Sequence, residues 1–153
     1  MKVVKEIISD RKMIQETTYI IDAKMYQYGF TRNTRDLPET SSMQKQITYG
    51  DFIKNFVDSL TKIRNVFILP YNKMLPTFHL DINSEKKRVL KDDIIYIGEA
   101  SVNCRDNYRV EDYDRIFTFL IDFNYLLRSY RKREDLCINN LTAKVESSLK
   151  EGA

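Results

Sequence analysis

Acidic and basic side chains gather in the middle of the chain, where several segments have strand character. Carboxylates beside a lysine are the groups that a magnesium-dependent nuclease uses, because Mg²⁺ prefers oxygen ligands. A metal-dependent nuclease or other hydrolase is therefore one candidate function, with Asp81, Asp92 or Glu99 as the acting carboxylate. Turns and sheet rims also collect such residues without any catalytic role. The charged residues concerned are Asp81, Glu85, Lys86, Lys87, Asp92, Asp93 and Glu99.

Other catalytic patterns are weak. The single histidine, His79, lies two residues before Asp81 on the same strand face, but no motif ties a nucleophile to it. The segment "YIGEAS" has one glycine and none of the spacing of a phosphate loop. Cys104 and Cys137 match no metal or redox spacing, which favours a reducing compartment. We predict no catalytic residue, no metal site and no cofactor from these patterns.

Two basic clusters could bind nucleic acid, and the second has tyrosines nearby. The formal net charge is only +3, which permits such a partner without demanding one. Cations at a helix end are also explained by the helix dipole. A nucleic-acid-binding accessory protein is the second hypothesis. The clusters are Lys86, Lys87 and Arg88 with Lys91, and Arg128, Arg131, Lys132 and Arg133 with Tyr125 and Tyr130.

The first third of the chain predicts a hairpin, a strand and a long loop. "KVVKEII" followed by "SDRK" favours a hairpin over a helix. "TTYIIDAKMY" alternates, with apolar side chains on one side and Asp22 and Lys24 on the other, as in a half-buried strand. Residues 29–46 are polar and without periodicity, which predicts a loop that is either a flexible excursion or a contact arm.

An amphipathic helix is predicted at about 48–64, beginning with a capping box formed by Thr48 and Asp51. Its apolar face includes Phe52 and Phe56, and we expect this face to cover a sheet. Apolar runs then predict strands at 65–70, 77–83 and 93–102.

A long apolar helix is predicted at about 112–133, with acidic residues at its start and basic residues at its end, followed by a helical C-terminal tail. The order of elements predicts an α+β fold with an antiparallel or mixed β-sheet, in a single domain over residues 1–153. No stretch is apolar for long enough to span a bilayer, and the start does not have the pattern of a secretory signal. We expect the protein to lie in the cytoplasm or, if it is viral, in the host cytoplasm or the virion.

The predicted 112–133 helix has an apolar arc of about 220°, wider than one sheet can cover. Its own tail or a second copy of the chain must bury the rest. The leading hypothesis is therefore a non-enzymatic protein–protein interaction or assembly subunit that binds itself or another protein, with virus or phage assembly as one setting. The predicted interface consists of Phe117, Phe119, Ile121, Asn124 and Leu126.

Overall fold

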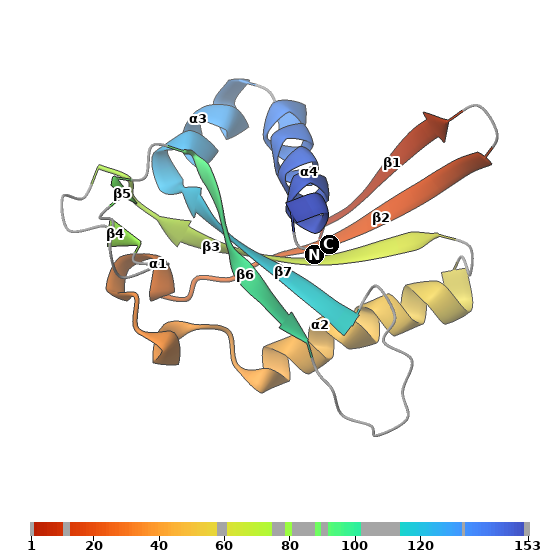
Figure 1. Cartoon of the computed structure of the whole chain (residues 1–153), viewed down its shortest axis with the longest axis horizontal. Helices are drawn as coiled ribbons and strands as arrows, with labels where there is room; N and C mark the ends of the chain where they lie inside the picture. Colours follow the sequence, from red (N-terminus) through yellow and green to blue (C-terminus); the bar gives the residue numbers. More distant parts are fainter. Residues whose placement is uncertain are drawn as a thin grey trace. The chain divides into compact units, whose positions relative to one another are not determined.

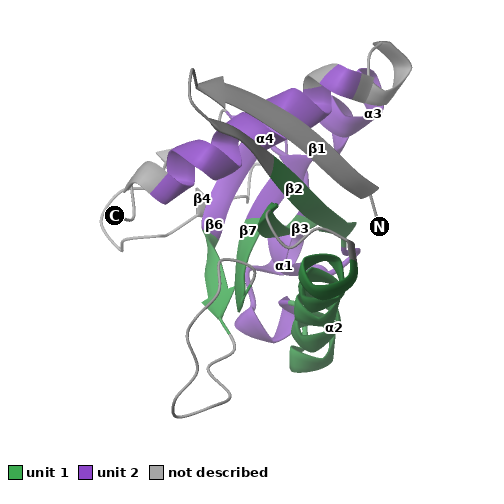
Figure 2. Cartoon of the chain, turned by 90° about the vertical axis from the view of Figure 1, so that its right-hand side faces the viewer, with its two compact units in different colours: residues 1–23, 38–68, 98–118 green, residues 24–37, 69–97, 119–153 purple. Residues whose placement is uncertain are grey.

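The computed structural model describes most of the 153-residue chain (Figure 1). The described residues are 2–10, 13–57, 61–74, 79–80, 88–89, 92–101, 114–132 and 134–151. The chain divides into two compact units (Figure 2). Unit 1 comprises residues 1–23, 38–68 and 98–118, and unit 2 comprises residues 24–37, 69–97 and 119–153.

The predicted N-terminal hairpin is confirmed. Strand β1 (Lys2–Asp10) pairs antiparallel with β2 (Met13–Ala23), and two residues connect them. Strand β3 (Lys62–Tyr71) pairs with β2 in parallel, in a register that runs from Thr17↔Lys62 to Ala23↔Ile68. Because parallel neighbours need a crossover, the chain between β2 and β3 must form an intervening connection. That connection contains α1 (Tyr28–Thr31), the 3₁₀ turn η1 (Thr34–Asp36), α2 (Thr40–Phe52) and the π-helical turn η2 (Ile53–Val57).

The larger sheet has the strand order β1-β2-β3-β7-β6, with β6 at Ile94–Ser101 and β7 at Arg115–Asp122. Two short strands, β4 (His79–Leu80) and β5 (Arg88–Val89), pair antiparallel in a separate sheet. Helices α3 (Phe123–Lys132) and α4 (Glu134–Glu151) complete the chain, and α4 confirms the predicted helical tail. The α+β class with a mixed sheet is therefore confirmed.

The predicted helix at 48–64 is wrong in its bounds. Helix α2 begins at Thr40, after Pro38, and β3 has already begun at Lys62. Within residues 40–47 only the stretch 43–46 consists of good helix formers, and it has no clear apolar face, so periodicity did not reveal this part of the helix. The region predicted as a polar loop at 29–46 thus contains most of α1, all of η1 and the start of α2.

The predicted long helix at 112–133 is also wrong in its first half. Residues 115–122 form β7, and the helix begins only at Phe123. Every residue from Ile116 to Asp122 is buried, so both faces of this strand are covered. A strand covered on both faces does not alternate between apolar and polar residues, and a continuous apolar run fits a buried helix equally well.

Each unit has its own apolar cluster. In unit 1, buried Ile20 and Ile63 are packed by Ile47, Tyr49 and Ile53. The side chain of Gln46, which is 1% exposed, donates from Nε2 to the carbonyl of Ile20 at 2.7 Å and ties α2 to β2. The prediction that β2 is half-buried is wrong at its centre, because both Tyr19 and Ile20 are 0% exposed.

In unit 2 the cluster consists of Leu69, Tyr71, Ile95 and Leu120, with partly buried neighbours that include Tyr26 and Tyr28. Gly29 in α1 permits a close backbone approach in this unit. A Cβ atom at position 29 would lie 2.1 Å from the carbonyl oxygen of Pro70, so any larger residue would push the two segments apart.

Candidate functional site

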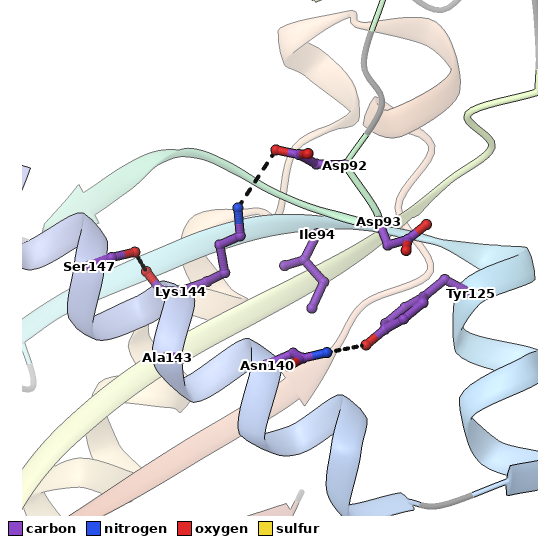
Figure 3. Close-up of a pocket in the computed structure, with 8 residues that line it drawn as sticks. All are labelled: Asp92, Asp93, Ile94, Tyr125, Asn140, Ala143, Lys144 and Ser147. Atoms are coloured by element: carbon purple, nitrogen blue, oxygen red, sulfur yellow. Dashed lines mark hydrogen bonds and ion pairs between the residues drawn. The ribbon is translucent and has the colours of Figure 1, made fainter.

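A pocket of about 420 Å³ lies in unit 2 (Figure 3). Its walls come from the residues that lead into β6, from α3 and from α4, so three segments far apart in the sequence meet around it. Six of the eight lining residues have polar side chains, and the other two are Ile94 and Ala143. The lining residues are Asp92, Asp93, Ile94, Tyr125, Asn140, Ala143, Lys144 and Ser147.

Several of the lining side chains contact one another. The Lys144 ammonium lies 3.6 Å from a carboxylate oxygen of Asp92, and both groups are largely exposed. The Asn140 side-chain amide donates to the hydroxyl of Tyr125 at 2.8 Å. Figure 3 shows both contacts reaching from α4 to the facing segments. The two pairs connect α4 to the other walls of the pocket. The Lys144–Asp92 ion pair is exposed, and such a pair contributes little to stability.

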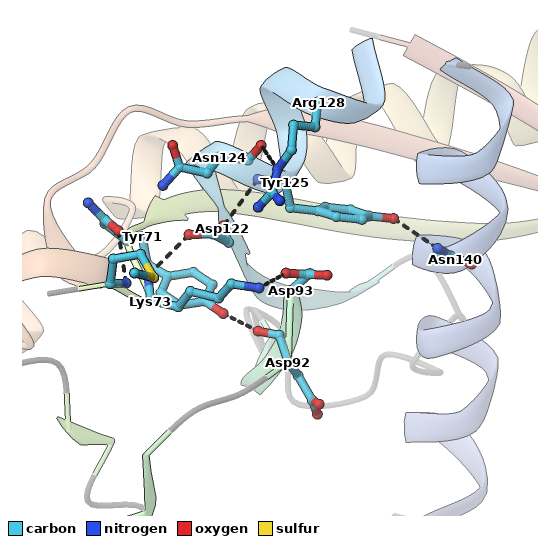
Figure 4. Close-up of polar contacts among 11 residues, drawn as sticks. Tyr71, Lys73, Asp92, Asp93, Asp122, Asn124, Tyr125, Arg128 and Asn140 are labelled. Atoms are coloured by element: carbon cyan, nitrogen blue, oxygen red, sulfur yellow. Dashed lines mark hydrogen bonds and ion pairs between the residues drawn. The ribbon is translucent and has the colours of Figure 1, made fainter. Parts of the chain in front are cut away.

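A second polar network adjoins these residues and is centred on Asp122, which is 0% exposed (Figure 4). One oxygen of its carboxylate accepts from the backbone N–H of Lys73 and the other from the backbone N–H of Tyr125, both at 3.1 Å. Tyr125 is the third residue of α3, so Asp122 has the contact of an N-cap residue. The backbone N–H of Asp122 donates to the carbonyl of Asp93 at 2.8 Å.

Lys73 and Tyr71 complete this network from the end of β3. The Lys73 ammonium pairs with the Asp93 carboxylate, and the Tyr71 hydroxyl donates to the backbone carbonyl of Asp92. Burial raises the pKa of Tyr71 well above its usual value, and the negative charges of Asp122, Asp93 and Asp92 raise it further. Tyr71 therefore remains a protonated hydrogen-bond donor at neutral pH.

Asp92, Asp93 and Asp122 are thus engaged with cations and backbone donors of the same unit. Within the described parts of the chain, no group of three or more His, Cys, Asp or Glu residues could hold a metal ion. The network can fix the ends of β3 and β7 against the start of β6. This arrangement is typical of structural support for a fold.

The sequence-predicted carboxylates are only partly placed by the structure. Asp92 and Asp93 lie at the pocket, whereas Glu99 pairs with Arg115 at 2.5 Å. Asp81, Glu85, Lys86 and Lys87 lie outside the described residues.

The predicted basic clusters are also only partly placed. In α3, Arg128 is exposed, and its Nε donates to the backbone carbonyl of Asn124 at 3.1 Å. Arg131 and Lys132 form the last turn of α3, Arg88 lies in β5, and Arg133 and Lys91 lie outside the described residues.

Three of the five residues of the predicted protein interface do not lie on an exposed surface. Phe117, Phe119 and Ile121 are at most 1% exposed and form part of the chain's own core, because they lie in β7 and not on a helix. Asn124 is half-buried in α3, and Leu126 is 38% exposed. The apolar arc that motivated the assembly hypothesis therefore does not exist as a single helix face.

A carboxylate and a lysine that were predicted only as the polar side of a strand lie at the end of β2. Asp22 is half-buried and aligns with Phe67 of β3, and β2 lies between β1 and β3 in the sheet. Lys24 follows after one residue, just beyond the end of β2 at Ala23. One pattern in the sequence could have pointed to these two residues. It is an aspartate and a lysine separated by one residue at the end of a buried strand.

The described helices include none that is both long and apolar enough to cross a membrane.

A family model described as LlaJI restriction endonuclease matches residues 3–86, which is more than half of the chain. No curated protein and no solved structure matches the chain. This match corrects the predicted function, because it points to a restriction-modification nuclease and not to a structural, viral or non-enzymatic assembly protein. It supports nucleic acid as a partner and gives no support to a protein partner. The chain belongs to the LlaJI restriction endonuclease family.

Proposed function

We propose that this chain binds DNA and takes part in its metal-dependent cleavage within a restriction system. The family match over residues 3–86 carries this proposal. The proposal returns to the metal-dependent nuclease, which was the third hypothesis drawn from the sequence. The candidate residues now lie in the N-terminal half of the chain and not in its middle.

The matched residues favour Asp22 and Lys24 as the chemical groups. Both lie inside residues 3–86, as does the sequence-predicted Asp81, which is outside the described residues, whereas Asp92, Asp93 and Asp122 lie beyond residue 86. Asp22 lies where a buried central strand ends, and rigid strands hold side chains more firmly than loops do.

The proposed chemistry follows from the two side-chain types. The Asp22 carboxylate would hold a divalent cation, and Mg²⁺ is commonly held by one or two carboxylates together with substrate phosphates and water. Such an ion, when bound, activates water and stabilises charge on a phosphoryl group. The Lys24 ammonium would stabilise the negative charge that develops on the attacked phosphate. A site of this kind draws its remaining ligands from water and the substrate, so it does not require three or more protein ligands.

Contacts to the DNA backbone are proposed for the basic residues predicted from the sequence. Arg128 is exposed, and Arg131 and Lys132 follow in the last turn of α3. Their contribution would be independent of base sequence and would weaken with added salt.

The test compares the wild-type chain with Asp22→Asn and Lys24→Ala in a plasmid-cleavage assay, with Mg²⁺ and with a chelator. We expect either change to slow cleavage about 100-fold or more, because each removes a group that acts at the transition state. DNA binding measured by fluorescence anisotropy should be retained. Asp36→Asn is the matched control, since Asp36 is also half-buried and lies within the matched residues.

Two outcomes would contradict the proposal in different ways. Cleavage that survives Asp22→Asn and is lost in Asp93→Asn would move the active site to the unit 2 pocket. A wild-type chain that neither binds DNA nor cleaves it in Mg²⁺ would overturn the proposed function itself.

A further inference from the structure

Two phenylalanines at the end of α2 are exposed to an unusual degree. Phe52 is 56% exposed and Phe56 is 78% exposed, although the sequence predicts that both cover a sheet. Their rings stack on each other, with centroids 5.3 Å apart and planes 30° from parallel. Large apolar side chains that cluster on a surface mark contact sites more often than chance exposure does.

The pair continues a stripe along one helix face. Lys45, Tyr49, Phe52 and Phe56 occur at spacings of four, three and four residues, which places them on the same side of a helix. The Lys45 ammonium lies 5.9 Å from the centroid of the Tyr49 ring, within cation–π range. We call these four residues the α2 stripe.

Three of the four residues, Lys45, Phe52 and Phe56, are exposed, whereas Tyr49 is half-buried and packs against the Ile20 and Ile63 cluster. Gln46 and Gly50 are buried, and Ile53 packs against the Ile20 and Ile63 cluster. These three residues form the inward row of α2 and η2. The α2 stripe is offset from that row by one residue, which is about 100° around the helix, so Lys45, Phe52 and Phe56 face outward.

We infer that the α2 stripe is a DNA contact in which an unstacked base packs on the Phe52 and Phe56 rings while Lys45 contacts the phosphate backbone. This inference rests on the proposed function, because it takes DNA as the substrate. Exposed aromatic faces flanked by cations are the chemistry that binds single-stranded or unpaired bases. Lys45 is exposed, and it supplies the positive charge that complements a phosphate. All four residues lie within the residues matched to the restriction endonuclease family.

The π-helical turn gives a second reason to expect a functional contact here. Phe56 lies in η2, and π-helical turns occur frequently at functional sites. The turn is held by the Lys54 ammonium, which donates to the backbone carbonyl of Thr61 at 3.3 Å. Lys54, the second residue of η2, thus ties this turn to the residue that precedes β3.

The test measures the affinity of the full chain for a labelled duplex with a short single-stranded gap, with a fully paired duplex of the same sequence alongside. For Phe52→Ala/Phe56→Ala we expect a loss of at least about tenfold on the gapped DNA, because base–aromatic stacking contributes on this scale. The loss on the paired duplex should be smaller. Phe56→Tyr keeps an aromatic face and should bind as the wild type does.

Phe30→Ala is the matched control, since Phe30 is 47% exposed and lies in unit 2 outside the α2 stripe. It should leave affinity unchanged. Lys45→Met should reduce the slope of log affinity against log salt by about one.

Three results would overturn the inference. Equal binding of the gapped DNA by the wild type and the double variant would leave the proposed function standing and remove the α2 stripe from it. A change in solution mass on Phe52→Ala/Phe56→Ala, without a change in DNA affinity, would assign the stripe to contact between copies of the chain. Failure of the wild type to bind any DNA would sink the proposed function, and the inference with it.

Discussion

Strand β7 and the segment formed by α2 and η2 both carry closely spaced phenylalanines, yet they place them in opposite environments. Phe117 and Phe119 in β7 are 1% and 0% exposed, whereas Phe52 and Phe56 are 56% and 78% exposed. Side-chain type is the same in both places, so the difference comes from the neighbouring elements. An apolar run therefore predicts that a surface must be covered, but it does not identify the covering partner.

The largest expected difference is in stability. Phe119→Ala should lower the free energy of unfolding by about 3–5 kcal/mol, because it removes buried contacts and leaves a cavity. Phe56→Ala should change it by less than about 0.5 kcal/mol, because the side chain is already in water. Urea unfolding followed by circular dichroism measures both. Equal losses for the two variants would mean that Phe56 is buried in solution and would remove the contrast.

The next effect concerns the residue that ends β7. Asp122→Ala should cost about 1–3 kcal/mol, because the buried backbone N–H groups of Lys73 and Tyr125 would lose their acceptor. Asp122→Asn keeps one carbonyl oxygen and should cost less. Urea unfolding gives the free energies, and hydrogen exchange at the Tyr125 amide shows whether the start of α3 has opened. An Asp122→Ala variant as stable as the wild type would show that water replaces the carboxylate.

A smaller effect depends on pH. Because the folded chain raises the pKa of Tyr71 above its usual value of 10.0, the unfolded chain loses this proton first as the pH rises. The stability linked to Tyr71 is therefore complete below about pH 10 and declines above it. Tyr71→Phe should cost about 1 kcal/mol at neutral pH, through the lost hydrogen bond to the Asp92 carbonyl.

Urea unfolding at neutral pH and at about pH 10.5 tests this, because Tyr71→Phe should lose less stability between the two conditions than the wild type does. Parallel losses in the two proteins would mean that Tyr71 titrates normally. The same series on Phe56→Ala should show the pH dependence of the wild type, since Phe56 is exposed and has no titratable group.

Sequence reasoning reached the class of the fold and its local elements where one physical signal dominated. The β1 and β2 hairpin, the strand that became β3 and the helical tail each had such a signal, from β-branched content, a continuous apolar run or fourfold spacing. It failed at residues 115–122 because burial on both faces removes the alternation that identifies a strand. It also failed at residues 40–47, where helix propensity had no apolar face to accompany it.

The candidate site was harder to predict, for a different reason. Asp22 was correctly predicted to lie in a strand, whereas Lys24 lies beyond the end of β2 at Ala23. A polar pair at alternate positions is usually a solvated face of a strand. The polar network of unit 2 brings Lys73, Asp93, Asp122 and Tyr125 together from positions up to 52 residues apart. No local pattern contains such a meeting, because it is created by the pairing of strands and the packing of helices.

The junction at Asp122 has a mechanical consequence. Strand β7 ends at this residue and α3 begins at the next one, so no flexible linker separates them. The Asp122 carboxylate accepts one hydrogen bond from the first turn of α3 and another from the backbone after β3. A force that displaces α3 would therefore act directly on the ends of β7 and β3, because no flexible residues lie between them and the helix. Any event that tilts this helix must also strain the ends of two strands.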